Sequence, residues 1–249
     1  LLAEAFWLME GYFAHGLGMH RVYNSDFMHA MADERNAEFR QRLKSILAFE
    51  PRLLTRQVNF LSTPDEESAR NRFGSQDKYF GAATLLATLP GTPMFAHGQV
   101  DGLRERYSMD SRQPQVEESP DAALAARHLR QIAPLLRRRE LFAGLEHFRI
   151  YDVANQAGAR MEDVFAFSNR GGGQRALVAF NNSPKACMAL ITAELVVGLD
   201  LGAATHWRGR ELVGDTEFHW DASTLAKSGL RLQLDAYQAQ VYWQFEPAA

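Results

Sequence analysis

Cysteine is almost absent from this 249-residue sequence, in which Cys187 is the only one. A single cysteine excludes a disulfide within the chain and a zinc site built from cysteines. Such low cysteine use is typical of a reducing compartment, so we expect a cytoplasmic protein. The chain begins Leu1-Leu2-Ala3 rather than with Met, and its first residues therefore give no information about a signal peptide.

Several other features are missing. No run of about 18 apolar residues occurs, so no membrane-spanning helix is predicted. The net charge is -3, and the only basic run is 137–139, which does not favour a nucleic-acid partner. The sequence has no P-loop, no G-x-G-x-x-G, no G-x-S-x-G and no H-E-x-x-H. We therefore predict no nucleotide cofactor, no serine-hydrolase chemistry and no metal site.

The first part of the sequence alternates strand and helix patterns. Strands are expected at 1–6, 19–24, 57–61 and 94–96, and helices at 25–49, from 63, at 77–89 and at 121–141. Four strand–helix units make half of an eightfold barrel. Because a complete (β/α)8 barrel needs roughly 250 residues, this chain cannot hold one together with a second domain.

After Gly144 the hydrophobic period changes to two. Alternating segments occur at 164–168, 176–180, 230–234 and 240–245, and the glycines at 171–173 indicate a hairpin loop. This part is predicted to be an all-β antiparallel sandwich. The predicted fold class is thus α/β, the C-terminal half of a (β/α)8 TIM barrel over residues 1–144 followed by a β-sandwich domain over 145–249.

Two carboxylates stand near the ends of predicted strands. Glu4 lies in an apolar strand, where it is either a catalytic group or a buried carboxylate paired with an arginine. Asp65 follows the third strand, where it is either catalytic or a favourable charge in the first turn of a helix capped by Thr63. Taken together, two carboxylates at the ends of different barrel strands suit glycoside chemistry.

Candidate sugar-binding residues surround these carboxylates. Aromatic side chains with polar edges suit the flat apolar faces of sugars, and Trp7 and Tyr23 are of this type. Asn24 is polar and lies at the expected end of the second strand. We therefore predict that Trp7, Tyr23 and Asn24 bind substrate.

Four segments, taken in order, resemble the alpha-amylase family, family 13 of the glycoside hydrolases. Residues 1–7 (LLAEAFW) resemble the fifth-strand motif of that family, and 58–65 (VNFLSTPD) resemble its seventh-strand motif. Residues 19–27 resemble its sixth-strand region, and 90–99 (PGTPMFAHGQ) resemble its eighth-strand segment. The resemblance covers the whole chain and implies strands five to eight of the barrel followed by the C-terminal β domain.

The resemblance also implies roles for individual residues. Glu4 takes the place of the general acid/base, and Asp65 that of the transition-state stabiliser. Gln99, at the end of the eighth-strand segment, is added to the predicted substrate-binding residues. The substrate is expected to be an α-glucan or maltooligosaccharide, and the missing N-terminal half of the barrel is the expected structural partner.

Three positions depart from the family pattern. The nucleophilic aspartate of the fourth strand is not in this chain. Pro64 replaces the histidine that usually precedes the seventh-strand aspartate, and His97-Gly98-Gln99 replaces a Gly-Asp-Glu ending. These departures leave a transglycosylase and a non-catalytic carbohydrate-binding relative open beside a retaining glycosidase. Calcium binding also stays open, because the family's usual calcium ligands lie mainly upstream.

Overall fold

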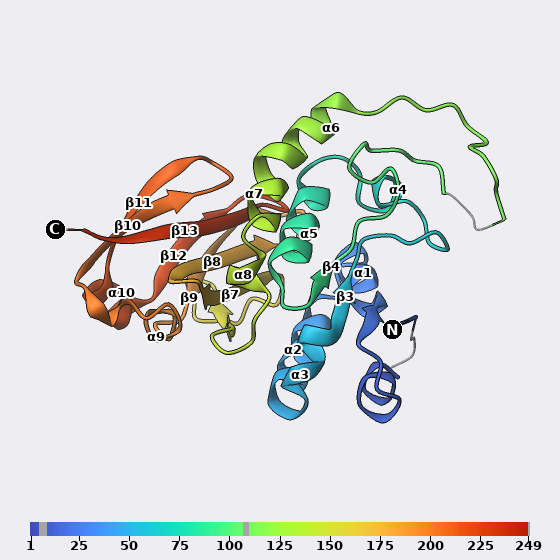
Figure 1. The fold of residues 1–249 in the computed structure, drawn as a ribbon. Coiled ribbons are helices and arrows are strands. Elements are labelled where there is room, and N and C mark those ends of the chain that lie inside the picture. The colour runs from blue at the N-terminus through green and yellow to red at the C-terminus, as the bar shows by residue number, and fades with distance from the viewer. Residues whose placement is uncertain (5–8, 107–109, 249) are drawn as a thin grey trace. The chain divides into compact units, whose positions relative to one another are not determined.

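A computed structural model describes residues 1–4, 9–106 and 110–248. The chain folds as two compact units, Leu1–Arg137 and Arg138–Ala249 (Figure 1). The sequence places the boundary near Gly144, after a helix ending at 141, whereas the units divide before the short helix α8 (Arg139–Phe142). This helix belongs with the second unit, because Nδ2 of Asn169 donates to the Phe142 carbonyl at 3.1 Å.

The first unit contains a parallel four-stranded sheet with the strand order β1-β2-β3-β4. The strands are β1 (Leu2–Ala3), β2 (Arg21–Asn24), β3 (Gln57–Asn59) and β4 (Thr92–Pro93). Four parallel strands in sequence order, joined by helical segments, are half of a (β/α)8 barrel, which confirms the predicted fold class. The predicted strand at 94–96 is wrong in position, since β4 ends at Pro93.

Glycine is required immediately before β4. Gly91 has a φ of 98°, and a Cβ there would lie 2.5 Å from the carbonyl oxygen of Gln57 and 2.7 Å from that of Leu54. Only a residue without a side chain fits this close approach between backbones. The Pro-Gly-Thr-Pro turn thereby brings β4 beside β3.

Helices connect the strands, and their limits differ in part from the predicted ones. The expected helix at 25–49 is two helices, because Glu34 between them has a φ of 56°. Asn24 rather than Ser25 caps the first of these, since its Oδ1 accepts a hydrogen bond from the Phe27 amide. Pro51 both ends the second helix and begins the next, because proline lacks the amide that a first helical position does not need. The helices are α1 (Ser25–Ala32), α2 (Asn36–Phe49), α3 (Pro51–Arg56), α4 (Ala69–Phe73) and α5 (Asp77–Thr88).

The predicted helix at 121–141 is interrupted. A π-helical turn, η2, occupies its middle, and Pro134 lies at the start of α7, where a proline is tolerated. Asp121 begins the run by accepting hydrogen bonds from the amides of Ala123 and Leu124. The segments are α6 (Ala122–Arg127), η2 (His128–Ile132) and α7 (Ala133–Leu136), and another π-helical turn, η1 (Tyr12–Gly16), follows β1. No helix among the described residues is long and apolar enough to cross a membrane.

The second unit contains two antiparallel sheets, with orders β11-β10-β13-β8-β7-β5 and β12-β9-β6. Apolar side chains from both sheets form one core, among them Val164, Leu177, Ile191 and Leu232. The predicted sandwich is therefore confirmed, although this part is not all strand, since it also contains α9 (Leu195–Gly198), η3 (Leu201–Ala203) and α10 (Ala222–Ser228). The strands are β5 (Arg149–Tyr151), β6 (Val153–Ala154), β7 (Val164–Gly171), β8 (Gln174–Asn181), β9 (Cys187–Ile191), β10 (His206–Glu211), β11 (Thr216–Asp221), β12 (Leu230–Leu234) and β13 (Ala239–Ala248).

Candidate active site

The carboxyl ends of the four parallel strands share one edge, and three predicted site residues meet there. Glu4 follows β1, Tyr23 is in β2, and Asp65 lies in a turn after β3. The pKa of Tyr23 is raised, first by burial of its hydroxyl and then by the negative charges of Glu4 and Asp65. Both carboxylates thus act on the same hydroxyl, which remains protonated and able to donate a hydrogen bond.

Glu4 is exposed rather than buried. Among the described residues, no group forms an ion pair or a hydrogen bond with its carboxylate. The alternative of a buried carboxylate paired with an arginine is therefore wrong for this structure. A carboxylate without a structural partner at the end of a barrel strand is available to a ligand.

Asp65 is also exposed, and it lies in a turn rather than at the start of a helix. The expected helix capped by Thr63 is wrong, since the next helix begins only at Ala69. The carboxylate of Glu66, the residue after Asp65, contacts two other elements. It accepts a hydrogen bond from Nη2 of Arg72 at 2.8 Å and lies 3.7 Å from Nε2 of His29. These contacts hold the turn that carries Asp65 against α4 and α1.

Helix α4 begins after this turn and has its own cap. Oγ of Ser68 accepts a hydrogen bond from the amide of Asn71 at 3.3 Å. The helix start is therefore separated from Asp65, whose charge serves no helix dipole.

Asn24 has a structural role that the sequence does not reveal. Its Nδ2 donates to Oδ1 of Asn59 at 2.8 Å, and Nδ2 of Asn59 donates to the carbonyl of Pro90 at 3.1 Å. Asn24 is 4% exposed, and its Oδ1 caps α1. This buried amide ties β2 to β3 and caps α1, so the structure assigns Asn24 a structural role in place of the predicted substrate binding.

Gln99 is likewise buried, with 4% of its surface exposed. Its Oε1 accepts a hydrogen bond from the amide of Ala96 at 3.2 Å, which braces the turn after β4. Its carbonyl accepts a hydrogen bond from the Tyr79 hydroxyl at 3.4 Å. Its Nε2 is buried and has no hydrogen-bond partner among the described residues. The substrate-binding role of Gln99 stays a prediction, and the proposed site is built without it.

Trp7 and Tyr23 are the remaining residues predicted to bind substrate. Trp7 lies outside the described residues. Tyr23 packs against Phe60, with the ring centroids 4.9 Å apart and the planes inclined by 58°. This contact fixes the Tyr23 ring at the carboxyl end of the sheet while leaving it half-buried.

One contact at this edge is not predicted from the sequence. Nη1 of Arg106 donates a hydrogen bond to the carbonyl oxygen of Asp65 at 3.4 Å. The two residues are 41 positions apart in the sequence, and no motif links them. The described residues contain no group of three or more His, Cys, Asp or Glu side chains suited to a metal ion.

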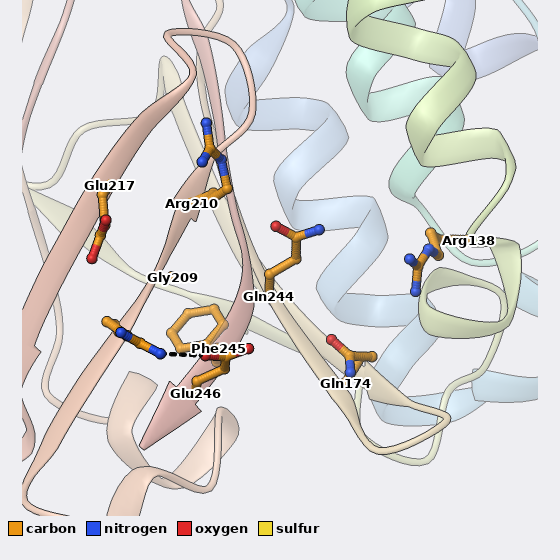
Figure 2. Close-up of a pocket in the computed structure, with 9 residues that line it drawn as sticks. Arg138, Gln174, Gly209, Arg210, Glu217, Gln244, Phe245 and Glu246 are labelled. Atoms are coloured by element: carbon orange, nitrogen blue, oxygen red, sulfur yellow. Dashed lines mark hydrogen bonds and ion pairs between the residues drawn. The ribbon is translucent and has the colours of Figure 1, made fainter. Parts of the chain in front are cut away.

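The second unit has a hollow of about 450 Å³, lined mainly by charged and amide side chains (Figure 2). Its charged groups are largely paired within the protein. Arg208 lies 3.0 Å from the carboxylate of Glu246, and Arg210 pairs with Asp215. Phe245, which also lines the hollow, is 7% exposed. The hollow therefore offers no exposed aromatic surface for a sugar.

Comparisons with family models and with curated proteins give no match to this sequence. Comparison with solved structures gives strong similarity. An Anoxybacillus alpha-amylase aligns over 100% of this chain with a TM-score of 0.70 and 15% identity, and 52% of its own chain is covered. The alpha-amylase from Geobacillus thermoleovorans, solved with acarbose, aligns over 100% with a TM-score of 0.71 and 16% identity, and 54% of it is covered.

A debranching enzyme from Nostoc punctiforme aligns over 97% of this chain, with a TM-score of 0.67 and 17% identity, and 51% of it is covered. The chain thus spans about half the length of the solved structures that it matches. At such low identity the similarity concerns the fold. The chain has the fold of the C-terminal part of an alpha-amylase, half of the (β/α)8 barrel followed by a β-sandwich domain.

Proposed function

We propose that this chain is the C-terminal part of a retaining glycosidase of the alpha-amylase family that acts on α-glucosidic bonds. The observation that carries the proposal is that Glu4 and Asp65 lie close enough to the hydroxyl of Tyr23 for both negative charges to raise its pKa. The three residues lie at the carboxyl end of the sheet. In barrel enzymes the chemistry takes place at this end. The sugar-cleaving activities named for the similar structures support the same class of reaction.

In the proposed reaction Glu4 acts as general acid and then as general base. Its carboxyl proton passes to the glycosidic oxygen as the bond to the leaving sugar breaks, and the carboxylate later accepts a proton from the attacking water. Asp65 stabilises the positive charge that develops on the reacting sugar ring. The hydroxyl of Tyr23, which feels the charge of both carboxylates, orients the substrate by donating a hydrogen bond to a sugar oxygen.

The nucleophile of a retaining glycosidase forms a covalent bond to the sugar and is a second carboxylate near the acid. We propose that it comes from the barrel half that precedes Leu1 in the full-length protein. By this proposal the isolated 249 residues bind the rest of the barrel and are inactive alone. The substrate class is an α-glucan or maltooligosaccharide, consistent with the acarbose bound by the Geobacillus enzyme.

The test uses the full-length protein, meaning this chain preceded by its own upstream sequence. We expect Glu4→Gln to reduce kcat on maltooligosaccharides by about 10²–10⁴-fold, because proton transfer to the leaving oxygen is lost. Asp65→Asn should reduce it by about 10²–10³-fold, because charge stabilisation is lost. Glu67→Gln is a matched control, since Glu67 is exposed and has no partner among the described residues.

Substrate choice gives a second readout. Glu4→Gln should keep much more of its activity on an aryl glycoside with an acidic leaving group, which needs little protonation. Asp65→Asn should be impaired on both substrates. Turnover of Glu4→Gln equal to that of Glu67→Gln would contradict the assignment of the acid.

A further inference from the structure

The stretch between β4 and α6 approaches the candidate active site through Arg106. Nη1 of this exposed arginine donates a hydrogen bond to the carbonyl of Asp65 at 3.4 Å. In Figure 1 the green stretch runs past α4, and Nδ2 of Asn71 in that helix donates to the carbonyl of Arg104 at 3.2 Å. The structure describes two arms of the stretch, 101–106 and 110–121.

The two arms are tied together by a pair of glutamates, which we call the carboxylate latch. The carboxylate of Glu118 accepts hydrogen bonds from the amides of Arg104, at 2.8 Å, and Glu105, at 2.7 Å. In return the carboxylate of Glu105 accepts hydrogen bonds from the amides of Gln115, at 2.7 Å, and Val116, at 3.2 Å. Hydrogen bonds to an ionised acceptor are stronger than neutral ones, so the latch restrains the backbone next to Arg106.

The two ends of the stretch are also hydrogen-bonded to each other. The amide of Asp121 donates to the carbonyl of Asp101 at 2.8 Å. The carboxylate of Asp121 lies 3.3 Å from Nη2 of Arg70, a residue of α4. Because Asn71 of α4 contacts Arg104, each of the two arms is attached to this helix at one place.

Helix α4 restrains the other partner too. Arg72 in α4 holds Glu66, which is the neighbour of Asp65, at 2.8 Å. One short helix therefore positions both the turn with Asp65 and the arm with Arg106. The Arg106–Asp65 contact joins these two segments directly, although they are far apart in the sequence.

We propose that Arg106, held by the carboxylate latch, is a positioning residue that fixes Asp65 for its action on the sugar ring. The inference rests on the proposed function. A carboxylate that stabilises developing charge must be held in place before the reaction, and small displacements of such groups reduce rates strongly. Arg106 acts on the backbone of Asp65 and leaves its carboxylate for the substrate.

The test compares variants of the full-length protein. We expect Arg106→Ala to lower kcat/KM on maltooligosaccharides by about 10-fold or more, since Asp65 loses a restraint. Arg106→Lys keeps a cationic donor and should recover part of the loss. The matched control is Arg112→Ala, because Arg112 is an exposed arginine of the same stretch without a partner among the described residues.

The latch is tested separately. Glu118→Ala removes the acceptor of two amides and should lower kcat/KM in the same direction as Arg106→Ala. Glu117→Ala is its control, since the exposed Glu117 accepts no hydrogen bond from the described residues. Equal activities of Glu118→Ala and Glu117→Ala would overturn the role of the latch.

A double-mutant cycle separates positioning from a general structural effect. Dissociation constants for acarbose are measured for wild type, Arg106→Ala, Asp65→Asn and the double variant. If Arg106 acts through Asp65, its removal weakens acarbose binding in the wild type but has little further effect in Asp65→Asn. Additive losses of acarbose affinity in the double variant would overturn the proposal. Equal kcat/KM values for Arg106→Ala and Arg112→Ala, together with an inactive Asp65→Asn, would overturn it too. Full activity of Asp65→Asn would instead refute the proposed function, and this inference with it.

Discussion

The hydroxyl of Tyr79 lies 2.6 Å from Nε2 of His128, and both side chains are buried in the first unit. The imidazole is surrounded by the rings of Tyr79, Phe80 and Phe95, with centroids 5.3 to 6.0 Å away. Burial lowers the pKa of His128 to about 4, so the ring is neutral in the folded protein at neutral pH. This pair joins α5 to the π-helical turn η2, and the Tyr79 hydroxyl also contacts the carbonyl of Gln99 in the turn after β4.

The neutral histidine predicts a loss of stability in acid. Since the folded pKa is below that of an unfolded histidine, about 6.5, the unfolded chain binds the extra proton first. The free energy of unfolding should be unaffected by His128 above pH 6.5 and should fall as the pH drops from 6.5 towards 4, by about 1–3 kcal/mol in total. Urea unfolding of the full-length protein at several pH values measures this.

Replacing His128 should reduce the fall in the free energy of unfolding between pH 6.5 and 4. His128→Gln is expected to be less stable at pH 7, because the packing and the bond to Tyr79 change, but to lose less stability between pH 6.5 and 4. His15→Gln is the control, since His15 is exposed. A profile of His128→Gln with the same slope as wild type would contradict the prediction.

The fold could be predicted where apolar residues alone define the pattern. Leu230, Leu232 and Leu234 alternate with polar residues and form β12 as expected. Strand β10 was missed because its inward positions are Trp207, Gly209 and Glu211, which show no apolar alternation. Glu211 is tolerated there because its carboxylate accepts hydrogen bonds from three backbone amides, those of Val213, Gly214 and Val241.

The sequence predicts only part of the candidate site, because it does not show which partner a polar side chain faces. Glu4, Tyr23 and Asp65 could be grouped because the ends of parallel strands share an edge. Polarity near a strand end does not reveal whether an amide faces a ligand or the protein itself. Asn24 bonds to Asn59 and caps α1, and Oε1 of Gln99 accepts a hydrogen bond from the amide of Ala96. Arg106 could not be found, because its contact with Asp65 depends on how a long connection folds.

The second unit should fold alone. Its core is built from residues between Tyr151 and Phe245, so residues 138–249 contain all the parts of the sandwich core. We expect an isolated 138–249 segment to be monomeric and to unfold in one cooperative transition on heating, measured by circular dichroism.

The first unit should behave differently in isolation. Leu1, Leu2, Met9, Tyr12 and Leu17 are large apolar side chains exposed around β1, an edge strand of the parallel sheet. An unpaired edge beside apolar surface favours association. An isolated 1–137 segment is therefore expected to aggregate, as light scattering would report, and a monomeric 1–137 segment with a sharp thermal transition would contradict this.

The pairing of β10 with β13 shifts its register between Arg208 and Arg210, and Gly209 lies at this bulge. A Cβ at this position would lie 2.5 Å from Cζ of Phe218 and 2.6 Å from the carbonyl oxygen of Trp243. Gly209 lies beside the hollow of the second unit (Figure 2). Gly209→Ala should destabilise residues 138–249 by about 1–3 kcal/mol in urea unfolding, because neither group can move without disturbing the core. Gly202→Ala is the control, since a Cβ there meets nothing within 4 Å, and equal stabilities of the two variants would contradict the prediction.

The choice between hydrolysis and transfer depends on the acceptor that reaches the sugar bound to the nucleophile. Pro64, which precedes Asp65, is exposed and brings no hydrogen-bond donor to the cleavage point. Glu4 and Asp65 are both exposed, and Arg106 contacts only the backbone carbonyl of Asp65, so water has access to both carboxylates. We expect the full-length protein to convert maltoheptaose into shorter products only, as resolved by chromatography over a time course. Products longer than maltoheptaose, increasing with substrate concentration, would instead identify a glucanotransferase, because a sugar hydroxyl would then be competing successfully with water for the same intermediate.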